Sequence, residues 1–205
     1  MKRSGLFAAL LTTITLTAVA SADSIDMNDP RRTVGREGNV RVDAQLVKDT
    51  VSPGSPIGVT WQIENLSENP VAVADKVADA TYDADTQTIT VAIGAEVPQD
   101  GKMPRLVMVK PGEKKVFRSG AIPALSAAAT RTSLAPPRYV QVKVSILRDP
   151  APFAKMRADE VLPDDLFDKW FEANDSIFLN TVPVRFAARA SGTNFVGADQ
   201  RGGGF

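Results

Sequence analysis

The sequence IGVTWQIE, at residues 57–64, decides the fold class. It alternates Ile, Val, Trp and Ile with Gly, Thr, Gln and Glu, and residues 39–46 and 139–146 repeat the alternation. Successive side chains of a strand point to opposite faces, so each run places one apolar face on a core and one polar face in water. We therefore predict three long, half-buried strands and an all-β fold.

Shorter apolar runs between turn residues extend this pattern. Pro53-Gly54 lies between the long runs at 39–46 and 57–64, and Pro111-Gly112 joins two shorter runs. Proline presets a turn corner and glycine accepts the positive φ that many turns need. Residues 83–86 are expected to turn a hairpin, and further strands are expected at 71–77, 80–82, 88–93, 105–109, 114–118 and 177–186.

One helix is expected at residues 163–174, PDDLFDKWFEAN. Its apolar residues recur at helical spacing, Pro163 suits the first helical position, and Asp164 and Asp165 place negative charge in the first turn. This helix would lie shortly before the last strand.

The ends of the chain differ in composition from its middle. Residues 1–22 combine Lys2-Arg3, an uncharged and largely apolar stretch, and a final Ala-Ser-Ala, which together predict a secretory signal peptide. An uncleaved membrane anchor is the competing interpretation, but the apolar stretch is short and contains threonines. Residues 23–38 are expected to be a flexible lead-in, 39–186 one folded domain, and 187–205 a flexible glycine-rich tail.

Localisation follows from this division of the chain. Cleavage would leave a periplasmic or secreted protein, and no later stretch is apolar enough to be a transmembrane segment.

Composition excludes several kinds of chemistry. The chain has 24 basic and 24 acidic side chains, no His and no Cys. It can form no disulfide, no Cys/His zinc site and no His-based catalytic pair. Its neutrality argues against a nucleic-acid partner bound through a basic field. We expect no enzyme activity and no cofactor.

Two segments carry a resemblance. Residues 51–67, VSPGSPIGVTWQIENLS, and 109–113, VKPGE, are similar to turn-and-strand segments of bacterial exported immunoglobulin-like domains and of the bacterial intracellular proteinase inhibitor family. The resemblance implies an immunoglobulin-like sandwich, here with one short helix near the C-terminal strand. It transfers no functional residue. The second family suggests protease inhibition, for which the proline-ended segment 124–137 is the candidate loop.

The predicted helix carries the candidate partner-binding residues Phe167, Trp170 and Phe171. Aromatic side chains at helical spacing can anchor a helix in a partner's groove. The competing interpretation, which we favour, is that they pack over an end or face of the sandwich. Similarly, Trp61 lies on the apolar face of its strand and is expected in the core, with a carbohydrate-stacking platform as the alternative.

Two acidic groups are candidate chemical sites. Asp79, Asp83 and Asp85 offer oxygen ligands for Ca²⁺, but aspartates in a hairpin turn usually bond their own backbone. A second group, Asp164, Asp165 and Asp168, could perform acid–base work, or could form the charged start and solvated face of a helix. The second interpretation is favoured in both cases.

The sequence thus predicts an exported, non-enzymatic accessory or binding module. It would contact another exported protein through loops or a sheet edge. The alternatives are a protease inhibitor and, less favoured, an exported carboxylate-dependent hydrolase.

Overall fold

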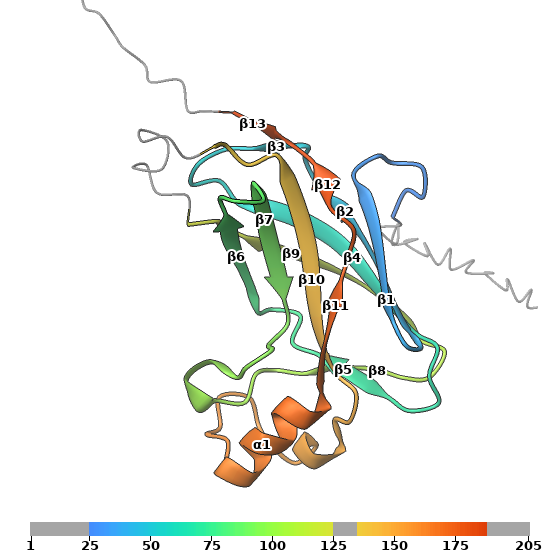
Figure 1. Ribbon diagram of the computed structural model, residues 1–205. Coiled ribbons are helices and arrows are strands. Elements are labelled where there is room, and N and C mark those ends of the chain that lie inside the picture. Colours follow the sequence, from blue (N-terminus) through green and yellow to red (C-terminus); the bar gives the residue numbers. More distant parts are fainter. Residues whose placement is uncertain (1–24, 125–134, 188–205) are drawn as a thin grey trace, which may run out of the picture.

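A computed structural model describes residues 25–124 and 135–187. This part of the chain is mostly β-strand, with one α-helix and two short 3-10 helices, which confirms the all-β prediction (Figure 1). The elements are β1 (Arg32–Glu37), β2 (Val40–Leu46), β3 (Thr50–Val51), β4 (Ile57–Asn65), β5 (Val71–Val73), β6 (Ala78–Asp83), β7 (Thr88–Ile93), η1 (Gln99–Gly101), β8 (Val107–Val109), β9 (Lys114–Ala121), β10 (Tyr139–Leu147), η2 (Ala151–Phe153), α1 (Asp164–Ala173), β11 (Asn174–Phe178), β12 (Val182–Pro183) and β13 (Arg185–Phe186).

The first sheet, called sheet 1 below, has the order β1-β2-β4-β9, and all its neighbours are antiparallel. The alternation of residues 57–64 sets its central strand, in which every second side chain of β4 is buried. This confirms the face assignment made from the sequence.

The second sheet, sheet 2, has the order β6-β7-β10-β5-β8, and β11 and β12 also pair with β10. The expected hairpin joins β6 and β7. In contrast to the other pairs of this sheet, β7 and β10 run parallel. Past the end of β7, Leu147 of β10 pairs instead with Ala72 of β5.

Gly94 makes this change of partner possible. Its φ is +87°, and a Cβ there would lie 2.5 Å from the Ser145 carbonyl oxygen. Only glycine tolerates both conditions. At Gly94 the chain that follows β7 can therefore turn away while its backbone still lies against β10.

The two sheets face one another across a main core of aliphatic residues (Figure 1). Trp61 is fully buried in it and stacks on Phe117 with ring centroids 4.5 Å apart. Its indole N–H donates to the Ser119 hydroxyl at 3.0 Å, so its single polar atom has a partner. The expectation of a core Trp61 is confirmed, and a carbohydrate platform is wrong for this residue.

A second, smaller core lies under α1 at one end of the sheets. It is formed by one face of α1, η2 and the outer side of β5, and its buried residues are Ala72, Ala74, Ala95, Met103, Leu147, Phe153, Leu162 and Trp170. The helix begins within one residue of the prediction, with Pro163 as its N-cap residue instead of its first helical residue.

The lead-in prediction is wrong for its second half. Residues 23–38 were expected to be flexible, but Arg32–Glu37 forms β1 on the edge of sheet 1. Gly35 lets the end of β11 approach closely, because a Cβ there would lie 2.9 Å from the Phe178 carbonyl oxygen. The segment 32–37 contains few apolar residues, so its sequence shows no hydrophobic alternation that would predict a strand.

Other boundaries also differ. The strand expected at 71–77 ends at Val73, and the one expected at 177–186 is divided among β11, β12 and β13. The predicted signal peptide, 1–22, and all but the first residue of the predicted tail, 187–205, lie outside the described residues.

Candidate functional site

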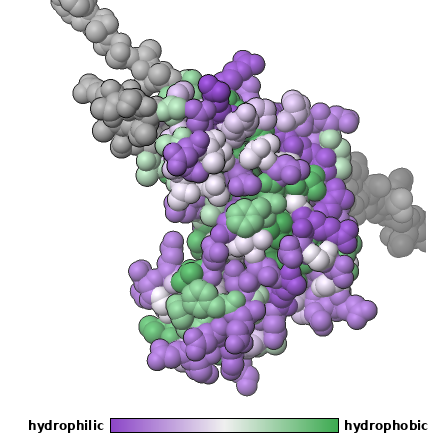
Figure 2. Space-filling view, in the orientation of Figure 1, coloured by the Kyte–Doolittle hydropathy of each residue, from purple (hydrophilic) through white to green (hydrophobic). Residues whose placement is uncertain are grey.

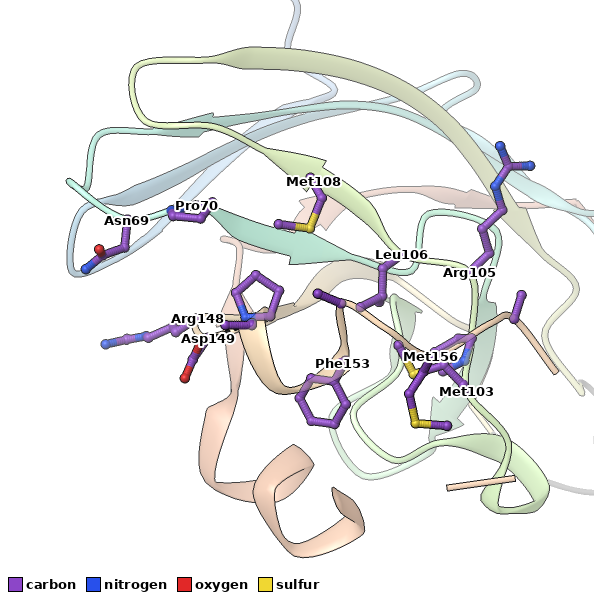
Figure 3. Close-up of a pocket in the computed structure, with 15 residues that line it drawn as sticks. Asn69, Pro70, Met103, Arg105, Leu106, Met108, Arg148, Asp149, Phe153 and Met156 are labelled. Carbon is purple, nitrogen blue, oxygen red and sulfur yellow. Dashed lines mark hydrogen bonds between the residues drawn. The ribbon is translucent and has the colours of Figure 1, made fainter. Parts of the chain in front are cut away.

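A groove of about 840 Å³ lies beside the small core, between sheet 2 and the segment that follows β10 (Figure 3). Three stretches of chain build it: the approach to β5, residues 103–108 leading into β8, and residues 148–158. The lining residues are Asn69, Pro70, Met103, Pro104, Arg105, Leu106, Met108, Arg148, Asp149, Pro150, Ala151, Phe153, Ala154, Met156 and Ala158.

Local sequence shapes the wall formed by residues 148–158. The Asp149 carboxylate accepts the Ala151 backbone N–H at 3.1 Å, and Pro150 starts the 3-10 turn η2. Phe153 then reaches into the small core, where its ring meets the Trp170 ring edge-on at 5.2 Å. The wall is therefore anchored by an aromatic side chain.

The opposite side of the groove is fixed by backbone bonds. The Met103 N–H donates to the Glu160 carbonyl and its own carbonyl accepts from the Asp159 N–H, both at 2.8 Å. Lys102 forms a β-bridge with Val161 beside them. These bonds hold the start of the 103–108 stretch against the 159–162 segment, so the groove is bounded at that end.

The lining is largely apolar and rich in methionine. Met103, Met108 and Met156 contribute three of the five methionines of the chain. Met103 is buried, whereas the Met108 side chain is 39% exposed. Flexible, polarisable thioethers adapt to irregular apolar surfaces. The groove therefore offers an apolar surface that can fit side chains of more than one shape.

Charged side chains stand at the margin of the groove. Arg148 pairs with Asp175 of β11 and, at 3.4 Å, with Glu37 of β1. These pairs connect the groove wall to both sheets. The apolar lining residues, rather than a cluster of carboxylates, dominate the space between these margins.

The three predicted partner-binding residues do not share one environment. Trp170 is fully buried, and its indole N–H lies 3.2 Å from both the Ala95 and the Glu96 carbonyl oxygens. This corrects the partner-binding assignment of Trp170, because a side chain closed off in the core cannot anchor a partner. Trp170 instead fits the competing interpretation, in which the aromatic side chain of the helix packs over the end of the sheets.

Phe167 and Phe171 lie on the outer side of the helix. Phe167 is half-buried, Phe171 is 49% exposed, and their rings meet edge-on at 5.1 Å. Figure 2 shows apolar surface at the α1 end of the molecule, surrounded by hydrophilic side chains. A partner contact at these two residues stays a prediction.

In the predicted calcium group, Asp83 ends β6 and Asp85 lies in the turn that follows, whereas Asp79 lies within β6. The Asp83 carboxylate accepts the Asp85 backbone N–H at 2.9 Å and the Thr86 hydroxyl at 2.8 Å, and these bonds lower the pKa of Asp83. Asp79 accepts the Ala80 N–H. The self-bonding interpretation is thus confirmed, and within residues 25–124 and 135–187 no three His, Cys, Asp or Glu side chains gather as a metal site would require.

The carboxylates of α1 also remain on the surface. Asp164, Asp165 and Asp168 are all exposed, and Asp165 lies 3.8 Å from Lys169 one turn later. They do not meet in the groove. Their arrangement fits the helix-start and solvated-face interpretation.

The loop considered for protease inhibition, 124–137, lies mostly outside the described residues, since 125–134 are not described. Among the helices that are described, none has the length and apolar character needed to cross a bilayer.

Sequence reasoning missed a buried ionic cluster on the outer face of sheet 1. Asp43 is only 1% exposed, pairs with Arg32 and Arg41, and accepts the Gln62 amide at 3.1 Å. Burial raises the pKa of this carboxyl, but the bonds from Gln62, Arg41 and Arg32 outweigh burial and lower it. The alternation of residues 39–46 placed Asp43 in water, whereas flanking arginines cover it.

The groove was also missed, and no local pattern marks it, because its three stretches are far apart in the sequence. Together, fold and site define an all-β protein of two facing sheets with an apolar, methionine-lined groove at one end. Comparison with protein-family models gave no match, and comparison with curated proteins gave none either.

Proposed function

We propose that this protein is an exported, non-enzymatic module of the immunoglobulin-like sandwich type that binds another exported protein through its groove. The observation that carries the proposal is the groove itself. It has a volume of about 840 Å³ and a largely apolar lining, and Met108 in that lining is exposed to solvent. Grooves of this size and character are typical of binding sites.

An extended polypeptide segment fits the groove better than a compact ligand. The groove lies along residues 103–108, and β8 ends the strand order of sheet 2 in the described part of the chain. The Met108 carbonyl of β8 accepts from the Lys115 ammonium and the Val109 carbonyl accepts from the Asn65 amide at 3.0 Å. Apolar pockets beside the strand, rather than a continuous backbone ladder, would therefore hold the side chains of an extended segment. We therefore expect an occupant with apolar side chains and little fixed structure of its own.

The remaining parts of the proposal rest on the sequence and on the arrangement of the strands. The Pro-Gly turns, the alternating strands and the two facing sheets support an immunoglobulin-like sandwich, although the parallel pairing of β7 and β10 must be accommodated in it. The character of residues 1–22 supports export to the periplasm or beyond the cell.

Site-specific photo-cross-linking in cells that naturally export the chain tests the proposal. One variant carries the photoreactive residue p-benzoylphenylalanine in place of Met108, and the control carries it in place of Val116 on β9. These positions are matched in exposure, 39% and 40%, but only Met108 lines the groove.

We expect one polypeptide to cross-link at position 108 and not at 116, through an apolar segment whose synthetic peptide suppresses the adduct. Equal cross-linking at both positions, or no adduct at 108, would refute the proposal.

A further inference from the structure

The sulfur chemistry of this chain is concentrated in the groove. The chain contains no cysteine, so its five methionines are its only sulfur atoms, and three of them line the groove. A methionine thioether is the side chain that small oxidants convert to a sulfoxide. The proposed binding surface therefore holds most of the thioether sulfur of the chain.

The three groove methionines differ in access to solvent. Met108 lies on the terminal strand β8 and is 39% exposed. Met156 is partly buried, and Met103, which follows the bridge residue Lys102, is buried. Among these three methionines a dissolved oxidant reaches Met108 first, because its reaction with a thioether requires access to the sulfur.

We propose that Met108 is a modification site whose oxidation closes the groove to apolar segments, an inference that rests on the proposed function. With hypochlorous acid as oxidant, one oxygen atom is transferred to the Met108 sulfur. An S–O bond forms and the O–Cl bond breaks. Sulfur loses two electrons, the chlorine gains them, and chloride and a proton leave.

The sulfoxide changes the groove because of where Met108 lies. It is paired in register with Ala72 of β5, so its side chain lies on the outer side of sheet 2, the side occupied by Phe153 and Leu106. An apolar occupant would cover the new S=O oxygen and bring no hydrogen-bond donor to it. Burying such a polar atom without a partner weakens binding, here by roughly tenfold or more.

The experiment uses an unfolded model polypeptide, reduced and carboxymethylated α-lactalbumin, as the extended probe. The full mature chain carries p-benzoylphenylalanine in place of Ala154, an exposed residue of the groove wall, so that Met108 stays native. The purified chain is treated with hypochlorous acid, quenched, and only then mixed with the probe and illuminated. Mass spectrometry measures the sulfoxide at each methionine.

Two substitutions serve as comparisons. Met108→Leu keeps an apolar side chain of similar volume that cannot be oxidised. Met27→Leu removes a methionine that is 56% exposed and does not line the groove. We expect oxidation to reduce the adduct at least about tenfold in the unsubstituted chain and in Met27→Leu, but not in Met108→Leu. Methionine sulfoxide reductase should restore it.

The other outcomes are informative separately. An adduct that survives stoichiometric oxidation of Met108, or that is lost equally in Met108→Leu, overturns the modification site and leaves the proposed function standing. Absence of any adduct before oxidation overturns this inference, because the groove then takes up no extended apolar segment, whereas the proposed function is decided separately by the cross-link at position 108 in cells.

Discussion

Replacing Trp170 and Phe171 one at a time separates the packing and partner roles of α1. Trp170 is fully buried, touches Phe153 and uses its indole N–H on two carbonyl groups. Trp170→Ala should therefore lower the free energy of unfolding by about 3–5 kcal/mol, from the lost contacts, the cavity and the unpaired carbonyls. Phe171 is half exposed, so Phe171→Ala should cost only about 1 kcal/mol.

Urea unfolding followed by far-ultraviolet circular dichroism measures both values, since the amide signal does not depend on the substituted indole. A domain of this size has about 5–15 kcal/mol of total stability, so Trp170→Ala approaches the limit of folding. Trp170→Phe is the milder companion variant. It keeps an aromatic ring and loses the N–H, and should cost about 1–2 kcal/mol.

The packing argument fails if Trp170→Ala and Phe171→Ala cost the same, because the small core would then not support the fold. A neutral Trp170→Phe would instead show that the indole N–H adds nothing to stability. Cross-linking at position 108 adds a second readout. Phe171→Ala should leave it unchanged, since Phe171 does not line the groove. Loss of the adduct in a folded Phe171→Ala variant would instead assign the partner contact to α1.

Three further substitutions test other parts of the structure. Asp43→Asn should lower stability by about 3 kcal/mol at pH 7, because Arg32 and Arg41 lose their buried counter-charge. Because folding lowers the pKa of Asp43, this carboxylate stabilises the fold at pH values above its unfolded pKa of about 3.9, and the stabilisation is lost as the pH falls through the folded pKa. Urea titrations in which the wild type and Asp43→Asn differ equally at every pH would contradict this. Gly94→Ala should prevent folding or cost more than about 3 kcal/mol, and native-like thermal unfolding would show that the backbone there can move. Ser119→Ala leaves the buried Trp61 N–H without its acceptor and should cost about 1 kcal/mol in a urea titration, whereas an unchanged midpoint would mean that the indole finds another acceptor.

Long alternating runs carried most of the fold prediction. Residues 57–64 and 139–146 form central parts of the two sheets, and 88–93 matches β7 to the residue, because one face of each run must be buried. The prediction failed for β1, whose inward positions are Thr33 and Gly35. A strand buried through small residues and a close backbone approach has little hydrophobic alternation to reveal it.

The candidate site could be predicted only in part. The spacing of Leu166, Phe167, Trp170 and Phe171 predicted an amphipathic helix but could not say which aromatic side chain faces the sheet. Asp43 looked solvated, since the pattern along one strand does not show that arginines from two strands will enclose it. The groove depends on tertiary packing of three distant stretches, which no local period encodes.

The parallel neighbours β7 and β10 have a consequence for the order of folding. All of β8 and β9 lies between them along the chain, so their pairing must close a long loop before it gains any contact. By comparison, β1–β2 and β6–β7 are hairpins that form from nearby residues. We expect the hairpins to appear early and the layer around β10 to close late. A nascent or truncated chain ending before β10 would therefore hold β6–β7 and β5–β8 without the strand that joins them, and the main core around Trp61 would stay open.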